Sequence, residues 1–213
     1  MRRLAIALIL VAAPISGANA HPHVMVEGNL EIVRDGSGNV SELRHVWRFD
    51  ELFSSDVLLN YDDDADGTLN AEELAEVGST VGNSIKEYDY YTQVRLDGTE
   101  VEFSDPDRVM VDYMDGQVLI FFALKLKESL AVNGRKFQVA VSDPTYYVAM
   151  ELADETAVQI SGDGTACTSE ILRPDFDKLY AQNQKTLSEQ FFSDSEGSAL
   201  GDEWLTWVNI QCQ

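Results

Sequence analysis

The sequence predicts a mainly β (α+β) fold, an antiparallel β-sandwich with an inserted helix–loop–helix and a C-terminal helix. Short segments of alternating apolar and polar residues recur along the chain, and Gly- or Asn-containing turns separate them. An acidic stretch after the first two segments is flanked by apolar residues at helical spacing. We expect a signal peptide at residues 1–20 and a single domain at residues 21–213, with the helical insertion at about residues 50–88.

Two strands at residues 24–34 and 40–49 are expected to form a hairpin, with a turn at residues 35–39. On the second strand His45 shares the apolar face with Leu43 and Trp47, and Asp50 after it can cap a helix. Further strands are expected at residues 90–96, 101–103, 109–113, 118–127, 137–141, 146–152, 157–160, 166–171 and 204–212, and a helix at 175–192.

Residues 62–73 match a twelve-residue EF-hand calcium loop. Calcium is a hard cation that takes six to eight oxygen ligands, and carboxylates at alternate positions supply them. Gly67 at position 6 permits the sharp turn that a side chain would obstruct. The expected ligands are Asp62, Asp64, Asp66, the Thr68 carbonyl, Asn70 and a bidentate Glu73. The alternative is a solvated acidic turn, because Asp and Gly are common in loops that bind nothing.

The first twenty residues predict export. Arg2 and Arg3 precede an apolar run at residues 4–13, and residues 18–20 read Ala-Asn-Ala, an A-x-A cleavage site. We expect cleavage after Ala20, a periplasmic location and no membrane anchor afterwards, because no later segment approaches eighteen consecutive apolar residues.

The charge of the chain limits the classes of partner that it can bind, and its cysteine content predicts a disulfide. The mature chain would have 13 basic and 37 acidic residues, a formal charge of 13 − 37 = −24, which disfavours nucleic acid and anionic membranes and suits cations. In an exported chain Cys167 and Cys212 are expected to form a disulfide that closes a loop of about 45 residues. A pair of thiolate metal ligands is the alternative that export disfavours.

Cleavage after Ala20 would make His21 the first residue, so its α-amine and imidazole could chelate a transition metal while His23 adds a second imidazole. Such nitrogen ligands suit Zn²⁺, Ni²⁺, Co²⁺ or Cu²⁺. A solvated strand start is the alternative. His45 is either a core histidine or a third ligand, and Asp143 either completes the site or organises a turn.

Several short motifs occur in a characteristic order: His-Pro-His-Val at 21–24, Trp-Arg-Phe-Asp-Glu at 47–51, the acidic loop, Lys-Glu-Tyr-Asp-Tyr-Tyr at 86–91 and Asp-Pro-Thr-Tyr-Tyr-Val at 143–148. In these motifs the chain resembles a bacterial family described as the periplasmic component of an ABC-type transport system. Members are commonly encoded beside, or fused to, nickel/cobalt-type permeases. The resemblance implies a role in divalent-metal handling and an inner-membrane metal permease as partner.

We do not expect an enzyme, because the sequence contains no nucleophile elbow, P-loop or dinucleotide fingerprint. The first hypothesis is a calcium-binding, periplasmic metal-binding accessory of a divalent transition-metal transport system. The second is a calcium-stabilised structural or protein-interaction module with no transport role. A third, a copper oxidase with an N-terminal histidine brace, ranks last because His45 is expected to face inward.

Overall fold

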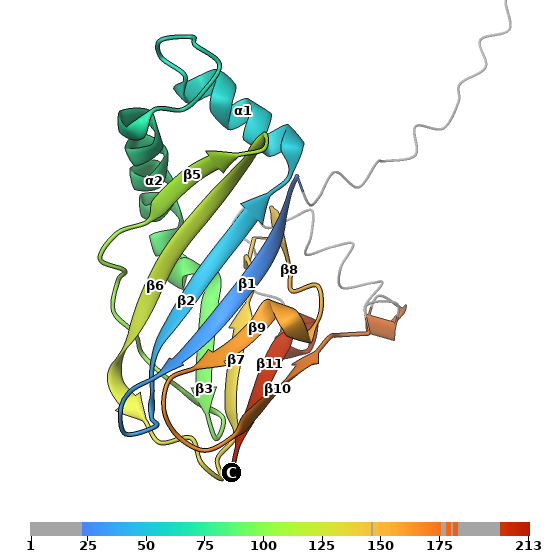
Figure 1. Cartoon of the computed structure of the whole chain (residues 1–213). Helices are drawn as coiled ribbons and strands as arrows, with labels where there is room; N and C mark the ends of the chain where they lie inside the picture. Colours follow the sequence, from blue (N-terminus) through green and yellow to red (C-terminus); the bar gives the residue numbers. More distant parts are fainter. Residues whose placement is uncertain (1–22, 146, 176–177, 180, 183–200) are drawn as a thin grey trace, which may run out of the picture.

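The computed structural model describes residues 23–145, 147–175, 178–179, 181–182 and 201–213. These residues form a six-stranded and a five-stranded β-sheet, and two helices lie toward one end of them (Figure 1). The predicted mainly β fold with an inserted helix–loop–helix is therefore confirmed. Across the described residues, no helix combines the length and the apolar character that crossing a membrane requires.

The six-stranded sheet has the order β5 (Met110–Met114), β6 (Gln117–Leu130), β2 (Val40–Phe49), β1 (Val24–Arg34) and β8 (Val148–Glu151), and β9 (Val158–Ser161) also pairs with β1. The five-stranded sheet has the order β10 (Cys167–Leu172), β11 (Trp207–Cys212), β7 (Phe137–Val141), β3 (Thr92–Leu96) and β4 (Thr99–Glu100). Short 3₁₀ turns occur at Asp89–Tyr91, Glu155–Ala157 and Asp202–Trp204.

One feature of the sheets differs from the antiparallel sandwich that the sequence predicts. Strand β1 pairs antiparallel with β2 but parallel with both β8 and β9. The chain reaches β8 from β7, a strand of the other sheet, so no hairpin turn forces β8 to run opposite to β1. The six-stranded sheet therefore contains both antiparallel and parallel strand pairs. No turn motif in the sequence indicates the parallel pairs.

The core lies between the two sheets, because inward side chains alternate with exposed ones along the strands. In β1, Leu30 and Ile32 are buried, and in β2 the predicted apolar face is buried from Leu43 to Phe49. The five-stranded sheet contributes a further set of fully buried side chains: Phe137, Val139, Val208 and Ile210.

The helical insertion is fixed at its start by a cap. The Asp50 carboxylate accepts a hydrogen bond from the Phe53 amide at 2.9 Å, as the sequence predicts, and begins α1 (Glu51–Tyr61). The buried Ser54 hydroxyl donates to the Asp50 carbonyl and accepts from the Val118 amide of β6 at 2.9 Å. These bonds attach α1 to the six-stranded sheet.

The second helix, α2 (Ala71–Lys86), contacts the strand at the sheet edge, β5. A Cβ atom on Gly78 would lie 2.6 Å from the Val109 carbonyl oxygen, so a glycine is needed for this close approach. Both helices thus attach the insertion to the six-stranded sheet. The loop between them projects away from the sheets (Figure 1).

Other boundaries differ locally. The strand expected at 101–103 is replaced by β4 and one isolated bridge between Phe103 and Leu126. The last strand begins at Trp207, because residues 202–204 form a 3₁₀ turn. Most of the helix expected at 175–192 lies outside the described residues. The predicted disulfide between Cys167 and Cys212 is present and joins directly paired residues of β10 and β11.

Candidate metal centre

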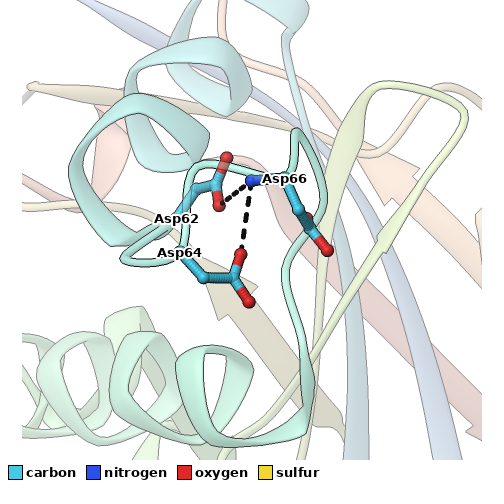
Figure 2. Close-up of side chains that lie close together, drawn as sticks. All are labelled: Asp62, Asp64 and Asp66. Atoms are coloured by element: carbon cyan, nitrogen blue, oxygen red, sulfur yellow. Dashed lines mark hydrogen bonds between the residues drawn. The ribbon is translucent and has the colours of Figure 1, made fainter.

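The loop that connects α1 to α2 gathers three aspartates. Helix α1 ends at Tyr61 with Asp62 as its C-cap, and the backbone then turns through positive φ values at Ala65 and Gly67, 56° and 84°. One carboxylate oxygen from each of Asp62, Asp64 and Asp66 lies within 4.8 Å of the others (Figure 2). The alternate spacing of these side chains therefore produces a compact group of oxygen donors.

Hydrogen bonds within the loop hold this arrangement. The Asp62 carboxylate accepts from the amides of Asp66 and Gly67 at 3.0 and 2.8 Å. Asp64 accepts from the same Asp66 amide at 3.2 Å, so two carboxylates converge on one N–H group (Figure 2). The Asp66 carboxylate in turn accepts from the Thr68 amide and hydroxyl at 2.8 and 2.7 Å.

The charges of the loop oppose one another. The pKa of the Asp64 carboxyl is raised above its usual range, first by partial loss of hydration and then by the negative charges of Asp66, Glu73 and Asp62. The pKa of Asp66 is lowered instead, because its carboxylate accepts the two Thr68 hydrogen bonds. A dication would relieve the repulsion at Asp64.

Glu73 and Asn70 form the base of the loop. The Glu73 carboxylate is buried and accepts from the Asp63 amide at 2.9 Å and the Asn70 amide at 2.7 Å. Asn70 accepts from the amides of Glu72 and Glu73, which completes a capping box at the start of α2. Glu73 is therefore not a member of the aspartate group, although its carboxylate closes the ends of the same loop.

The donor set fits a hard cation. All six predicted ligands offer oxygen, and the three that the structure brings together are carboxylates, which are the ligands that calcium prefers. Glu73 would join them only if its carboxylate moved toward the aspartates.

The structure does not bring the described histidines of the predicted site together. His23 is exposed at the start of β1, and its ring lies 5.1 Å from the ring of Tyr147. His45 of β2 is buried and pairs with Leu30, seven residues after His23 on β1, or about 23 Å along a strand. His23 and His45 therefore do not share a site, and His21 lies outside the described residues.

Asp143 is buried and its carboxylate is already occupied. It accepts from the Thr145 amide at 2.8 Å, from the Thr145 hydroxyl at 2.8 and 2.9 Å, and from the Val148 amide at 2.9 Å. These bonds organise the turn that leads into β8, which is the second of the two interpretations of this residue.

Comparison with known proteins places the chain in a family. A family model described as "Protein of unknown function (DUF1007)" matches residues 6–212. The chain belongs to the DUF1007 family. It is also similar to an uncharacterized protein of Haemophilus influenzae, with 23% identity over 198 residues that cover 92% of this chain and 93% of that protein. The shared length extends across the helical insertion and both sheets.

In this DUF1007 chain His45 is a core residue. Its ring stacks on Phe122 with 4.7 Å between centroids, and its Nε2 lies 3.4 Å from the Thr92 hydroxyl. Burial lowers the pKa of His45 to about 3, so the imidazole is neutral at ordinary pH. Its Nδ1 atom is buried with no hydrogen-bond partner among the described residues.

Sequence reasoning missed a second concave surface of the DUF1007 chain. A hollow of about 430 Å³ lies on the outer face of the six-stranded sheet, between the loop before β5 and the segment that leads into β9. The sequence contains one sign of this surface. Residues 118–124 of β6 are apolar at every position, whereas a strand with one solvated face alternates apolar and polar residues.

Proposed function

We propose that the chain is an exported calcium-binding protein and that the loop between α1 and α2 holds the ion. The observation that supports this most strongly is the convergence of Asp62, Asp64 and Asp66 within 4.8 Å at the middle of a helix–loop–helix. The Thr68 carbonyl, Asn70 and Glu73 would complete six or more oxygen ligands. Calcium would stabilise the folded chain by mass action, because the unfolded loop does not present these oxygens together.

Calcium binding would be coupled to the ends of the loop through Glu73. In the structure this carboxylate bonds to the amides of Asp63 and Asn70, which lie at loop positions 2 and 9. A cation that draws the carboxylate toward the aspartates would act on these bonds as well, and any bond lost would reduce the calcium affinity.

Calorimetric titration of calcium into the Glu73→Gln variant tests the site. Glutamine keeps one oxygen for the capping box but loses the charge and the bidentate geometry, so calcium affinity should fall by about tenfold or more. Glu72→Gln is the matched control, because Glu72 is exposed on the same helical turn and should leave the affinity unchanged. Unchanged affinity in Glu73→Gln would refute the assignment.

We further propose that this protein serves a divalent transition-metal transport system as a periplasmic accessory. The ordered motifs that it shares with permease-associated proteins support this role, and so does a sequence with 37 acidic and 15 basic residues. His23, next to the start of β1, would add a second imidazole to a metal that His21 chelates.

The transition-metal role is tested by the state of the N-terminus. Signal-cleaved protein should bind Zn²⁺, Ni²⁺, Co²⁺ or Cu²⁺ more tightly than a form extended by Met-Gly, since an amide replaces the α-amine donor of His21. Calcium affinity should be equal in the two forms, because the loop uses only oxygen ligands. Equal transition-metal affinity in the two forms would refute the proposed histidine site.

A calcium-stabilised structural or interaction module is the second candidate. One observation favours it: hydrogen bonds among Asp62, Asp66, Asn70 and Glu73 already order the loop and cap α2. In that case signal-cleaved protein isolated from its native compartment should contain calcium and no stoichiometric transition metal.

A further inference from the structure

The outer face of the six-stranded sheet has an apolar row that crosses three strands, β2, β6 and β5, and meets a polar residue on β1. Asn29 of β1 pairs with Val46 of β2, Val46 pairs with Phe121 of β6, and Phe121 pairs with Met110 of β5. Directly paired residues place their side chains on the same face. At about 4.8 Å between neighbouring strands, the apolar row from Val46 to Met110 is about 10 Å long. Figure 1 shows these four strands side by side.

Charged rows border the apolar row along part of its length. Glu27 pairs with Arg48 on one side of it, and Glu31 pairs with Arg44 on the other. Outward positions of a sandwich sheet are ordinarily polar, so the charged rows are expected and the apolar row between them is not. Within it, the Met110 side chain is 44% exposed.

The apolar row lies in a groove. Residues 107, 108 and 110 line one side of the 430 Å³ hollow, and residues 157 and 159 line the other. Val46, Phe121 and Ala123 also line it. The volume lies within the range of small-molecule sites, about 300–1,000 Å³.

One charge at the groove has no counter-charge. Arg44 pairs with Glu31 at 3.2 Å and Glu42 at 2.5 Å, and Asp107 pairs with Lys125 at 2.7 Å. Arg108 is exposed and forms no ion pair with any residue that the structure describes. Within the part of the chain that the structure describes, a protein of net charge −22 thus has an uncompensated guanidinium beside an apolar groove.

We propose that this groove binds a small amphiphile with one carboxylate and an unbranched apolar tail. The tail lies across Val46, Phe121 and Met110, and the carboxylate pairs with Arg108, whose planar guanidinium can donate two parallel hydrogen bonds. A second copy of this acidic chain, or an anionic lipid surface, would be repelled by the molecule as a whole, whereas a single carboxylate meets the local positive charge.

Decanoate is the probe, and decanol and decyltrimethylammonium are its uncharged and cationic counterparts. Each is titrated calorimetrically into the full chain below its micelle concentration, with and without calcium. Decanoate should bind saturably with one-to-one stoichiometry, decanol about tenfold more weakly, and the ammonium compound more weakly still. Calcium should not change the order, because Asp62, Asp64 and Asp66 do not line the groove.

Two variants separate the head group from the tail. Arg108→Gln should lower decanoate affinity about tenfold and leave decanol unchanged, and Phe121→Ser should weaken both ligands by about tenfold. Arg135→Gln is the matched control, because it removes the same charge from an arginine that pairs with Asp97 and does not line the groove. If Phe121→Ser does not fold, Ala123→Leu replaces it and should weaken both ligands by filling the groove.

The proposal is overturned by absence of saturable decanoate binding to the wild-type chain, or by equal decanoate affinity in the wild-type and Arg108→Gln proteins. It is also overturned if the wild-type chain is a dimer that Phe121→Ser converts to a folded monomer, since the face would then be an interface between copies.

Discussion

The acidic loop and the outer-face groove are built in opposite ways. The loop takes every expected ligand from twelve consecutive residues, 62–73, between two helices. The groove takes its lining from residues 29 to 159, which strand pairing brings together. A contiguous site can be recognised in a sequence because spacing along the chain determines its geometry. A site assembled by strand register becomes visible only once the register is known.

This difference predicts that substitutions in the sandwich and substitutions in the loop change different measured properties. The capping box and the aspartate bonds lie within the insertion, whereas the disulfide joins two strands of the five-stranded sheet. Variants in one region should therefore leave the measured property of the other region unchanged.

The largest effect is expected from the disulfide. Replacing Cys167 and Cys212 together by serine removes a crosslink between residues 45 apart, which should cost about 4 kcal/mol in free energy of unfolding in the chain-entropy model. Urea denaturation of oxidised wild type and the double variant measures it. Calcium affinity under conditions where both are folded should be the same, and a large loss of affinity would show that the loop depends on the sandwich.

A smaller, pH-dependent effect is expected from His45. Burial lowers its pKa to about 3 in the folded chain, while the unfolded chain takes up a proton near pH 6.5. The unfolded state therefore binds more protons between these values, and stability should fall as pH decreases. The contribution from pH 8 to pH 5 is about 2 kcal/mol.

Urea denaturation across that range should show a weaker loss of stability in His45→Leu than in wild type. Parallel pH profiles for wild type and His45→Leu would contradict the assignment of His45 as a neutral core residue.

The smallest effect concerns the backbone of the loop. Gly67 has φ of 84° and nothing within 4 Å of the position of a Cβ atom, so Gly67→Ala should destabilise the chain by about 1 kcal/mol through backbone strain alone. Ala65→Gly relieves a similar strain at φ 56°, but a glycine loses more conformational entropy on folding than an alanine. The two effects oppose each other, so the free energy of unfolding should change by less than about 0.5 kcal/mol. Thermal unfolding of the calcium-free variants tests this, and equal melting temperatures for the two variants would exclude the explanation.

Much of the fold could be predicted because local patterns determine it. Alternation placed His45 and Trp47 on the buried face of β2, and Asp50 was recognised as the cap of α1. The parallel pairing of β1 with β8 and β9 could not be predicted, because it depends on crossovers between sheets rather than on a turn. The groove could not be predicted for the same reason, because its apolar row forms only when the register of β2, β6 and β5 places Val46, Phe121 and Met110 side by side.

The candidate site was predictable only in part. Spacing identified the three aspartates, but it did not show that Glu73 and Asn70 bond to the backbone as a capping box. The possible grouping of His23 with His45 was not supported, because composition gives the number of histidines and not the distance along a strand between them.

The place of β11 in the five-stranded sheet has a consequence for the order of assembly. This strand follows every other strand in sequence, yet it lies between β10 and β7 in space, and Ile210 pairs with Phe137, 210 − 137 = 73 residues earlier. Until residues 207–212 are available, β7 has an unpaired edge along residues 137–140, which are all buried in the finished fold. Such an edge invites pairing with other chains. We therefore expect the unfinished polypeptide to be prone to association during synthesis, and we expect the five-stranded sheet to close late, when this short strand becomes available.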